Sequence, residues 1–157
     1  MNIENDQQST YKPIEDPVTI NHATSQPLKN HRGGSETILV VEDHDSIRRL
    51  MVRCLENHGY NVLPAVNGKD ALQVFRNYSE PIHMLLSDVI MPEMDGVQLA
   101  ETLQSLAPRL KVLFISGYTD DWNRYFDPAK GDKHLFQKPF TIPEFLAEVR
   151  KCLDRDG

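Results

Sequence analysis

Residues 82–88 read Ile82-His83-Met84-Leu85-Leu86-Ser87-Asp88, a mostly apolar run that ends in a carboxylate. The loop that follows this run is punctuated by Pro92 and Gly96. In sheets covered by helices on both faces, parallel strands are apolar throughout, and ligand sites lie beyond their carboxyl ends. This stretch therefore predicts a buried parallel strand of an α/β protein, which delivers Asp88 to a site.

Similar apolar runs recur along the chain. They begin near residues 38, 60, 83, 110 and 133, at intervals of 22, 23, 27 and 23 residues. Each interval fits one short strand, one helix and two turns. Five alternating strand–helix units predict a parallel sheet with helices on both faces and right-handed crossovers. We expect the flavodoxin-like, doubly wound (βα)5 form of the α/β class, with strand order 2-1-3-4-5.

Helix signals fill the gaps between these runs. Asn67, Asp95 and Thr141 are typical N-cap residues, and apolar residues at helical spacing follow each of them. The fourth gap, residues 119–132, is interrupted by a proline and a glycine. We therefore expect a short or irregular fourth helix.

The composition excludes several classes of function. The net charge of −6 argues against binding to a nucleic-acid backbone, because such domains usually carry a basic stripe. No apolar stretch approaches the roughly 20 residues of a membrane span, and the N-terminus lacks the basic start and apolar run of a secretory signal. We expect a cytoplasmic protein that binds neither nucleic acid nor membrane.

Residues 1–36 differ from the rest of the chain. They are polar, contain three prolines and end near Gly33-Gly34-Ser35. This composition indicates a flexible N-terminal extension ahead of one folded domain, residues 37–157. A docking peptide around Tyr11-Lys12-Pro13-Ile14 is the alternative for the extension. The sequence given stops at Gly157, a few residues past the last expected helix, so we expect no output module to follow.

Five polar residues follow the predicted strands at their carboxyl ends: Glu42, Asp43, Asp88, Ser116 and Lys138. The predicted strand order places the three carboxylates together. At about 5 Å and an effective dielectric of about 20, each pair repels by about 3 kcal/mol, so a counterion is needed. The ligands on offer are oxygens, which favours Mg²⁺. A carboxylate there can become an aspartyl phosphate, with Lys138 and Ser116 placed for the phosphoryl oxygens.

Each of these residues alone also has a structural explanation, as a helix cap, a turn former or a solvated lysine. Their joint occurrence in this order favours a site. His44 is either a phosphate carrier or metal ligand or, as we favour, a loop residue that adjusts local charge. His83 fits a structural position in a buried strand, and Cys54 and Cys152 fit buried helix faces.

Four motifs occur in an order typical of one family. They are Ile38-Leu39-Val40-Val41-Glu42-Asp43, Ser87-Asp88-Val89-Ile90-Met91-Pro92-Glu93-Met94-Asp95-Gly96, Ile115-Ser116-Gly117-Tyr118 and Gln137-Lys138-Pro139-Phe140. With these motifs, the chain from about residue 37 to residue 153 resembles a response-regulator receiver domain of two-component signalling. The sequences of the last two motifs are most similar to those in receivers of hybrid sensor histidine kinases.

The resemblance implies a role for each strand-end residue. Asp88 would accept a phosphoryl group from a histidine kinase or a histidine phosphotransfer protein. Mg²⁺ would be bound by Asp43, Asp88 and the backbone carbonyl of Ile90, with Glu42 acting mainly through water. The phosphoryl oxygens would be contacted by the two remaining residues, Ser116 and Lys138.

Two further expectations concern the edges of this site. The resemblance implies a cis peptide bond between Lys138 and Pro139. We also expect Ile90 and Tyr118 at the rim of the pocket, where apolar groups obstruct the water that hydrolyses an aspartyl phosphate. Slow self-dephosphorylation is therefore predicted.

The sequence departs from the family pattern at two positions. Glu42 stands where the family often has Asp, which keeps the charge on a longer side chain. Leu135 stands where the family usually has an aromatic ring that moves together with the Ser/Thr hydroxyl. Phe136 is next to it but faces the other side of the sheet by strand alternation, so this coupling is not carried over unchanged.

The leading hypothesis is a signalling domain that catalyses only its own phosphorylation and dephosphorylation. It would act through protein contacts, as a monomer or a phosphorylation-dependent dimer. The alternative is a receiver-like docking module that phosphorylation no longer controls. A phosphatase resembling the haloacid dehalogenases is disfavoured, because Ile90 stands where those enzymes carry a second Asp. A flavin-binding protein is disfavoured because no phosphate-binding loop follows the first strand.

Overall fold

The computed structural model describes residues 32–117 and 134–155, which contain five strands and four helices. In chain order these are β1 (Thr37–Val41), α1 (Asp45–Glu56), β2 (Asn61–Ala65), α2 (Gly68–Asn77), β3 (Met84–Asp88), α3 (Gly96–Leu106), β4 (Lys111–Ser116), β5 (His134–Gln137) and α5 (Ile142–Leu153). Each strand begins within one residue of its predicted start. The expected irregular fourth helix lies outside the described residues.

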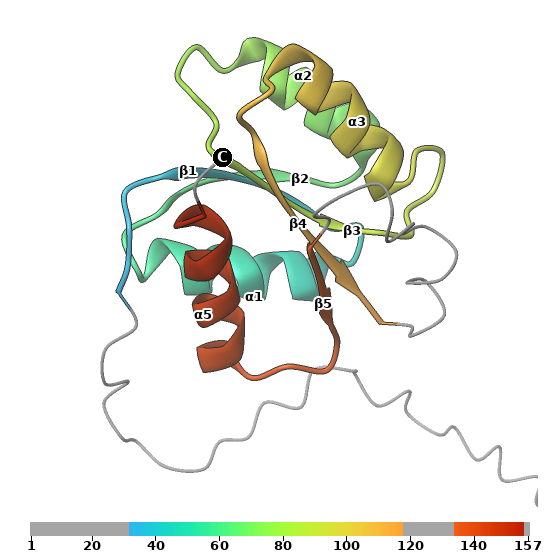
Figure 1. The fold of residues 1–157 in the computed structure, drawn as a ribbon. Helices are drawn as coiled ribbons and strands as arrows, with labels where there is room; N and C mark the ends of the chain where they lie inside the picture. Colours follow the sequence, from blue (N-terminus) through green and yellow to red (C-terminus); the bar gives the residue numbers. More distant parts are fainter. Residues whose placement is uncertain (1–31, 118–133, 156–157) are drawn as a thin grey trace, which may run out of the picture.

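The strands form one parallel sheet in the order β2-β1-β3-β4-β5, which confirms the predicted topology. Helices α2 and α3 cover one face of this sheet, and α1 and α5 cover the other (Figure 1). The chain order of the strands reverses between β1 and β3. In doubly wound sheets, this switch point is where ligands bind beyond the carboxyl ends of the strands.

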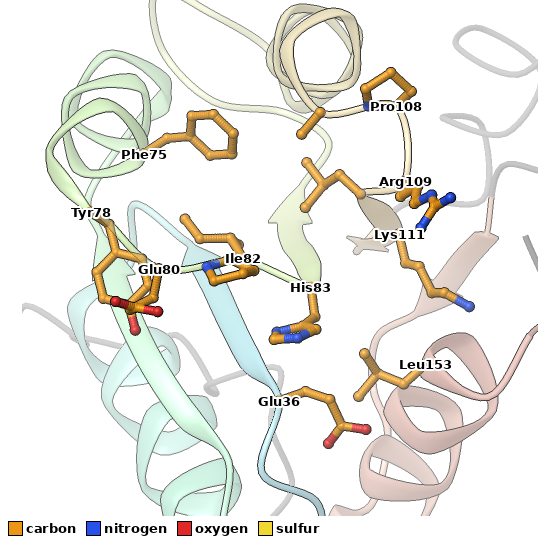
Figure 2. Close-up of a pocket in the computed structure, with 13 residues that line it drawn as sticks. Glu36, Phe75, Tyr78, Glu80, Ile82, His83, Pro108, Arg109, Lys111 and Leu153 are labelled. Carbon is orange, nitrogen blue, oxygen red and sulfur yellow. The ribbon is translucent and has the colours of Figure 1, made fainter.

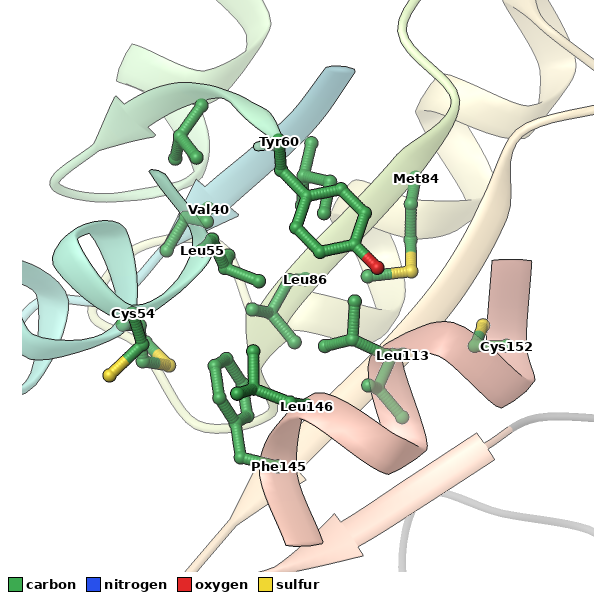
Figure 3. Close-up of a cluster of buried hydrophobic side chains, with 14 of the residues drawn as sticks. Val40, Cys54, Leu55, Tyr60, Met84, Leu86, Leu113, Phe145, Leu146 and Cys152 are labelled. Atoms are coloured by element: carbon green, nitrogen blue, oxygen red, sulfur yellow. The ribbon is translucent and has the colours of Figure 1, made fainter. Parts of the chain in front are cut away.

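Alternate residues of β1 belong to two separate hydrophobic cores, one on each face of the sheet. Ile38 and Val40 pack with α1 and α5, whereas Leu39 and Val41 pack with α2 and α3. In the first core, side chains from α1 and α5 meet those of the central strands (Figure 3). Each large side chain buried there contributes about 1.5–3 kcal/mol. Helices thus pack on both faces of the central strands. This packing holds the strand ends, and the polar residues that follow them, in defined positions.

Three of the four helices begin as predicted. Side-chain oxygens of Asn67, Asp95 and Thr141 each accept a backbone N–H of the first turn of α2, α3 and α5. Thr141 and Glu144 form a reciprocal capping box. Helix α1 differs, because its N-cap residue is His44, whose side chain makes no capping hydrogen bond.

Residues just before β1 already contact the domain. The Gly34 N–H donates to the His58 carbonyl at 3.2 Å. A Cβ at Gly33 would lie 2.0 Å from that same carbonyl oxygen, so the close approach requires glycine. Arg150 of α5 pairs with Glu36 at 2.8 Å. From Gly33 onward the chain is thus held against the α1–β2 loop and α5.

The structural residues behave largely as predicted. Cys54 and Cys152 are buried and unpaired, as expected for small hydrophobic side chains. His83 precedes β3 and is exposed, so its predicted burial in a strand is wrong. Its structural role holds, because His83 Nδ1 accepts the Thr37 N–H at 3.0 Å. None of the described helices is both long and apolar enough to span a bilayer.

Candidate functional site

The carboxyl ends of four strands meet at one edge of the sheet. In the parallel register the neighbouring pairs are Val41 with Ser87, Asp88 with Ile115, and Ser116 with Gln137. Side chains attached at or just after these positions therefore converge. The predicted site residues thus lie at this edge of the sheet, at or just after the ends of β1, β3, β4 and β5: Glu42, Asp43, Asp88, Ser116 and Lys138.

Lys138 lies between two carboxylates. Its Nζ is 3.1 Å from Glu42 Oε2 and 3.4 Å from Asp88 Oδ2, and only 7% of its side chain is exposed. The Lys138 N–H donates to the Ser116 carbonyl at 2.7 Å, and the Lys138–Pro139 peptide bond is cis, as the resemblance implied. Lys138 is therefore a buried charge at the centre of the site and not a solvated surface lysine.

Asp88 ends β3 with 15% of its side chain exposed. Its Oδ1 accepts the Ile90 N–H at 3.2 Å, while Oδ2 faces Lys138. Burial raises the pKa of Asp88 above its ordinary value, and the ammonium of Lys138 opposes that rise. The carboxylate is thus held in a defined orientation, but its charge is incompletely compensated.

Glu42 is a second buried carboxylate. Its side chain is completely inaccessible to solvent; Oε1 accepts the His44 N–H at 3.1 Å, and Oε2 faces Lys138. Burial raises the pKa of Glu42, Lys138 lowers it, and the charge of Asp88 adds to the rise. Asp43 lies nearer to solvent, with 32% of its side chain exposed.

The loop after β3 is shaped around Asp88. The Gly96 N–H donates to the Val89 carbonyl at 2.8 Å, and a Cβ at Gly96 would lie 2.1 Å from the Asp88 carbonyl oxygen. Only glycine therefore permits α3 to begin this close to the strand end. Ile90 is 45% exposed, which is compatible with its predicted place at the rim. Tyr118, the other predicted rim residue, lies outside the described residues.

The side chains of Leu135 and Phe136, three and two residues before Lys138, point to opposite faces of the sheet, as predicted. Leu135 packs against the α2 and α3 side, and Phe136 packs against the α1 and α5 side. The rings of Phe136 and Phe140 contact each other in a tilted arrangement with centroids 4.8 Å apart, and Phe140 stacks with Phe145 at 5.4 Å. Phe136 and Phe140 therefore lie on the α1 and α5 side of the sheet, opposite to Leu135.

A comparison with known protein families agrees with this geometry. The family model of the response regulator receiver domain matches residues 38–150, which is most of the chain. The chain belongs to the response regulator receiver family. This match includes all four motifs that carried the resemblance.

Curated relatives include both a kinase and a stand-alone receiver. The sensor kinase CckA of Brucella abortus is 36% identical over 122 residues, which make up 78% of this chain and 13% of the kinase. The response regulator receiver protein CpdR of the same organism is 37% identical over 116 residues, 74% of this chain and 95% of CpdR. The chain thus spans a small part of the kinase relative and nearly all of CpdR.

Solved receiver structures share the fold. The receiver domain of the hybrid histidine kinase CckA is 32% identical, with a TM-score of 0.63 over 75% of this chain and 99% of that domain. The response regulator TrrA of Thermotoga maritima, in complex with Mg²⁺ and BeF, is 26% identical, with a TM-score of 0.64 over 74% of this chain and 98% of TrrA. The similarity to hybrid-kinase receivers noted in the sequence is thereby confirmed.

The donor atoms of this receiver fit a hard divalent cation. Glu42, Asp43 and Asp88 supply carboxylate oxygens at the carboxyl ends of the neighbouring strands β1 and β3. Two of the three acids carry pKa values raised by burial, so a nearby cation would relieve an existing electrostatic cost. Oxygen ligands of this kind suit Mg²⁺.

Sequence reasoning missed Arg48, which holds the acidic loop. Arg48 Nη1 donates to the Glu42 carbonyl at 2.8 Å, and Nη2 pairs with Asp45 at 2.6 Å. The spacing of an acid and an arginine three residues apart on a helix was the available signal. It predicts the pair with Asp45 but not the contact with Glu42.

A pocket of about 770 Å³ lies at the opposite edge of the receiver. It is lined by residues at the amino ends of strands, among them Glu36, His83 and Lys111 (Figure 2). No motif signalled this pocket, because turns between helices and strands build it. We assign the chemistry to the carboxyl edge, where ligand sites of doubly wound sheets lie.

Proposed function

We propose that Asp88 is the phosphoacceptor of this receiver. A carboxylate oxygen of Asp88 would form the bond to phosphorus as the bond between phosphorus and a donor imidazole nitrogen breaks. The donor would be the phosphohistidine of a histidine kinase or a histidine phosphotransfer protein. The observation that carries the proposal is the contact of one buried ammonium, Lys138, with both Asp88 and Glu42.

The orientation of Asp88 supports its role as the nucleophile. Its Oδ1 is tied to the Ile90 N–H and its Oδ2 faces Lys138, so the carboxylate plane is fixed before a donor arrives. Fixed orientation removes entropy from the barrier of an attack. The incomplete compensation of its charge keeps electron density available on the oxygens.

Asp43, Asp88 and the backbone carbonyl of Ile90 would hold Mg²⁺, with Glu42 acting mainly through water. When bound, the ion would offset negative charge on the acids and on the incoming phosphoryl oxygens. The complete burial of Glu42 and its bond to the His44 N–H support its assignment behind the more exposed Asp43.

Lys138 and Ser116 would contact the phosphoryl oxygens. Lys138 is already aimed at Asp88, so it needs little rearrangement to follow the charge as it moves from the carboxylate to the phosphoryl group. The backbone bond from Lys138 to Ser116 couples the two positions. Signalling would then proceed through contacts with a protein partner, in keeping with a receiver rather than an enzyme.

The test is incubation of the full chain with Mg²⁺ and acetyl phosphate, followed by intact-mass measurement. The wild type should gain the mass of one phosphoryl group, and the gain should disappear with EDTA and in Asp88→Ala. Asp154→Asn, which changes an acid at the end of α5, should phosphorylate like the wild type. An undiminished gain in Asp88→Ala would overturn the assignment.

The position of Leu135 supports a second candidate, a docking module that phosphorylation no longer controls. Leu135 packs into the α2 and α3 side of the core without providing a ring. Mg²⁺ titration followed by thermal melting distinguishes the two, because a working site is stabilised by the ion. A receiver that neither binds Mg²⁺ nor gains phosphate, yet still binds its partner, would favour the docking module.

A further inference from the structure

The pocket at the amino edge of the sheet has an apolar middle between charges of opposite sign. Figure 2 shows Glu80 on one side and Arg109 and Lys111 on the other, with Phe75 and Ile82 between them. Phe75 and Ile82 are only half-buried, so part of each apolar side chain still faces solvent. Apolar surface with a charged rim is typical of a site that binds another protein segment.

The charges on the two sides of this amino-edge pocket differ in their availability. Glu36, which also lines the pocket, is engaged by Arg150 at 2.8 Å. Glu80 and Arg109 are exposed. Lys111 contacts one backbone carbonyl, and its ammonium group has three donors. A segment that fits this pocket therefore carries a basic residue toward Glu80 and acidic residues toward the other side.

The N-terminal extension contains a segment with this pattern, which lies outside the described residues. It reads Tyr11-Lys12-Pro13-Ile14-Glu15-Asp16, with a lysine, two apolar residues and then two acids. Proline-containing segments are recognised by grooves lined with aromatic rings, and Phe75 and Tyr78 line this pocket. The volume of about 770 Å³ is enough for a few side chains.

The attachment point of the extension lies beside the pocket. Residues 17–31 separate the segment from the described domain, and at about 3.3 Å per residue they can span up to about 50 Å. The domain begins at Arg32, and Glu36, four residues later, already lines the pocket. The segment is therefore within reach of the pocket of its own chain.

We propose that residues 11–16 bind in the amino-edge pocket of their own chain. Tyr11 and Ile14 pack on its apolar middle, Lys12 faces Glu80, and the two acids that follow face the cations on the other side. Attachment to the domain favours the chain's own segment over a second copy, because it gives a local concentration in the millimolar range. This binding takes place at the edge opposite the proposed phosphoacceptor and does not depend on phosphorylation.

The experiment measures binding of a fluorescein-labelled peptide of residues 9–18 to the full chain by fluorescence anisotropy. The peptide should bind to the variant Tyr11→Ala/Ile14→Ala, in which the chain's own segment is disabled. The wild type should bind the peptide about tenfold more weakly, because its own segment occupies the pocket. Ile20→Ala/Leu28→Ala, which truncates two apolar residues elsewhere in the extension, should behave like the wild type.

Charge reversal tests whether the peptide binds at this pocket. In the Tyr11→Ala/Ile14→Ala background, Glu80→Lys should weaken peptide binding about fivefold, and Lys12→Glu in the peptide should restore it. Glu56→Lys, which reverses an exposed acid at the end of α1, should leave the affinity within about twofold.

Three results overturn the proposal: no binding of the peptide, equal binding by the wild type and Tyr11→Ala/Ile14→Ala, or equal losses in Glu80→Lys and Glu56→Lys. Sedimentation velocity identifies which chain supplies the segment. A wild type that is monomeric at the assay concentration supports binding within one chain. A dimer that Tyr11→Ala/Ile14→Ala dissociates would overturn it in favour of a second copy.

Discussion

The two edges of the sheet treat carboxylates in opposite ways. At the carboxyl edge, burial raises the pKa of Asp88 and Glu42. At the amino edge, the hydrogen bond from Arg150 lowers the pKa of Glu36. At the carboxyl edge, burial opposes the ionisation of two acids that both contact one lysine, Lys138. At the amino edge, the guanidinium of Arg150 stabilises the ionised form of Glu36. This difference supports the proposal that the charges at the carboxyl edge accommodate a ligand, whereas those at the amino edge stabilise the fold.

The strongest way to break this comparison is to remove a lysine from each edge. Lys138→Met should slow phosphorylation of the receiver by about a hundred- to a thousandfold, the usual effect of deleting one donor to a developing charge. Lys111→Met, which loses a contact to the Arg155 carbonyl at the amino edge, should leave the rate within about twofold. Initial rates of phosphoryl gain from acetyl phosphate measure both variants.

Circular dichroism melts establish that both lysine variants remain folded before their rates are compared. The comparison between the edges fails if Lys138→Met stays within tenfold of the wild type. It also fails if Lys111→Met, far from the acids, slows the reaction as much.

A second prediction sharpens the comparison through the cation. Mg²⁺ at about 100 times its dissociation constant should raise the free energy of unfolding by about 2.7 kcal/mol. Most of that gain should vanish in Asp43→Asn, since the partly exposed Asp43 is a proposed ligand. Glu36→Gln, at the amino edge, should retain it. Urea unfolding with Mg²⁺ and with EDTA gives the Mg²⁺ effect on the free energy of unfolding for each of the three proteins. A full Mg²⁺ effect in Asp43→Asn would contradict the proposed ligand set.

The fold was predictable because its signals are local or periodic. The caps at Asn67, Asp95 and Thr141 and the apolar runs predicted the elements, and their alternation predicted a parallel sheet. The strand order was taken from the flavodoxin-like form and is confirmed. The convergence of Asp88 and Lys138 followed from that order, since carboxyl ends of parallel strands share an edge. The order of the strands was therefore enough to predict which strand-end residues lie close together.

Contacts that depend on side-chain torsions were not predictable. Nothing in the sequence indicates that Lys138 lies nearer to Glu42 than to Asp88, or that the His44 ring turns toward the acids. The pair of Glu36 and Arg150 joins residues 114 positions apart, with no motif at either end. The roles of the site residues and the cytoplasmic location stay predictions.

A third prediction concerns the rim of the carboxyl edge. Ile90→Asn should shorten the lifetime of the aspartyl phosphate by up to about tenfold, or about 1.4 kcal/mol in the barrier, because a polar side chain admits the attacking water. Val66 provides a matched control, because it is 45% exposed, like Ile90. It follows β2, which lies on the opposite side of β1 from β3. Val66→Asn should leave the lifetime unchanged. The decay of the phosphorylated mass after donor removal is the measurement, and equal lifetimes in all three proteins would exclude obstruction by Ile90.

The smallest expected effect lies at the amino edge, where Glu36→Gln removes a charged partner from Arg150. The pair is partly exposed, so the loss in unfolding free energy at pH 7 should be about 1 kcal/mol. Because the pKa of Glu36 is lowered by folding, its contribution is complete above the ordinary value of 4.5 and is lost as the pH falls through the lowered value. The difference between wild type and variant should therefore shrink below pH 4.5.

Urea unfolding of both proteins at pH 7, pH 5 and below pH 4.5 measures this difference. Glu56→Gln, an exposed acid at the end of α1, should differ from the wild type by less than about 0.5 kcal/mol at each pH. A Glu36→Gln penalty that persists unchanged in acid would mean that the side chain stabilises the fold by packing rather than by its charge. The contrast between the two edges would then lose its electrostatic basis at the amino edge, while the pKa rise of the buried acids at the other edge would be unaffected.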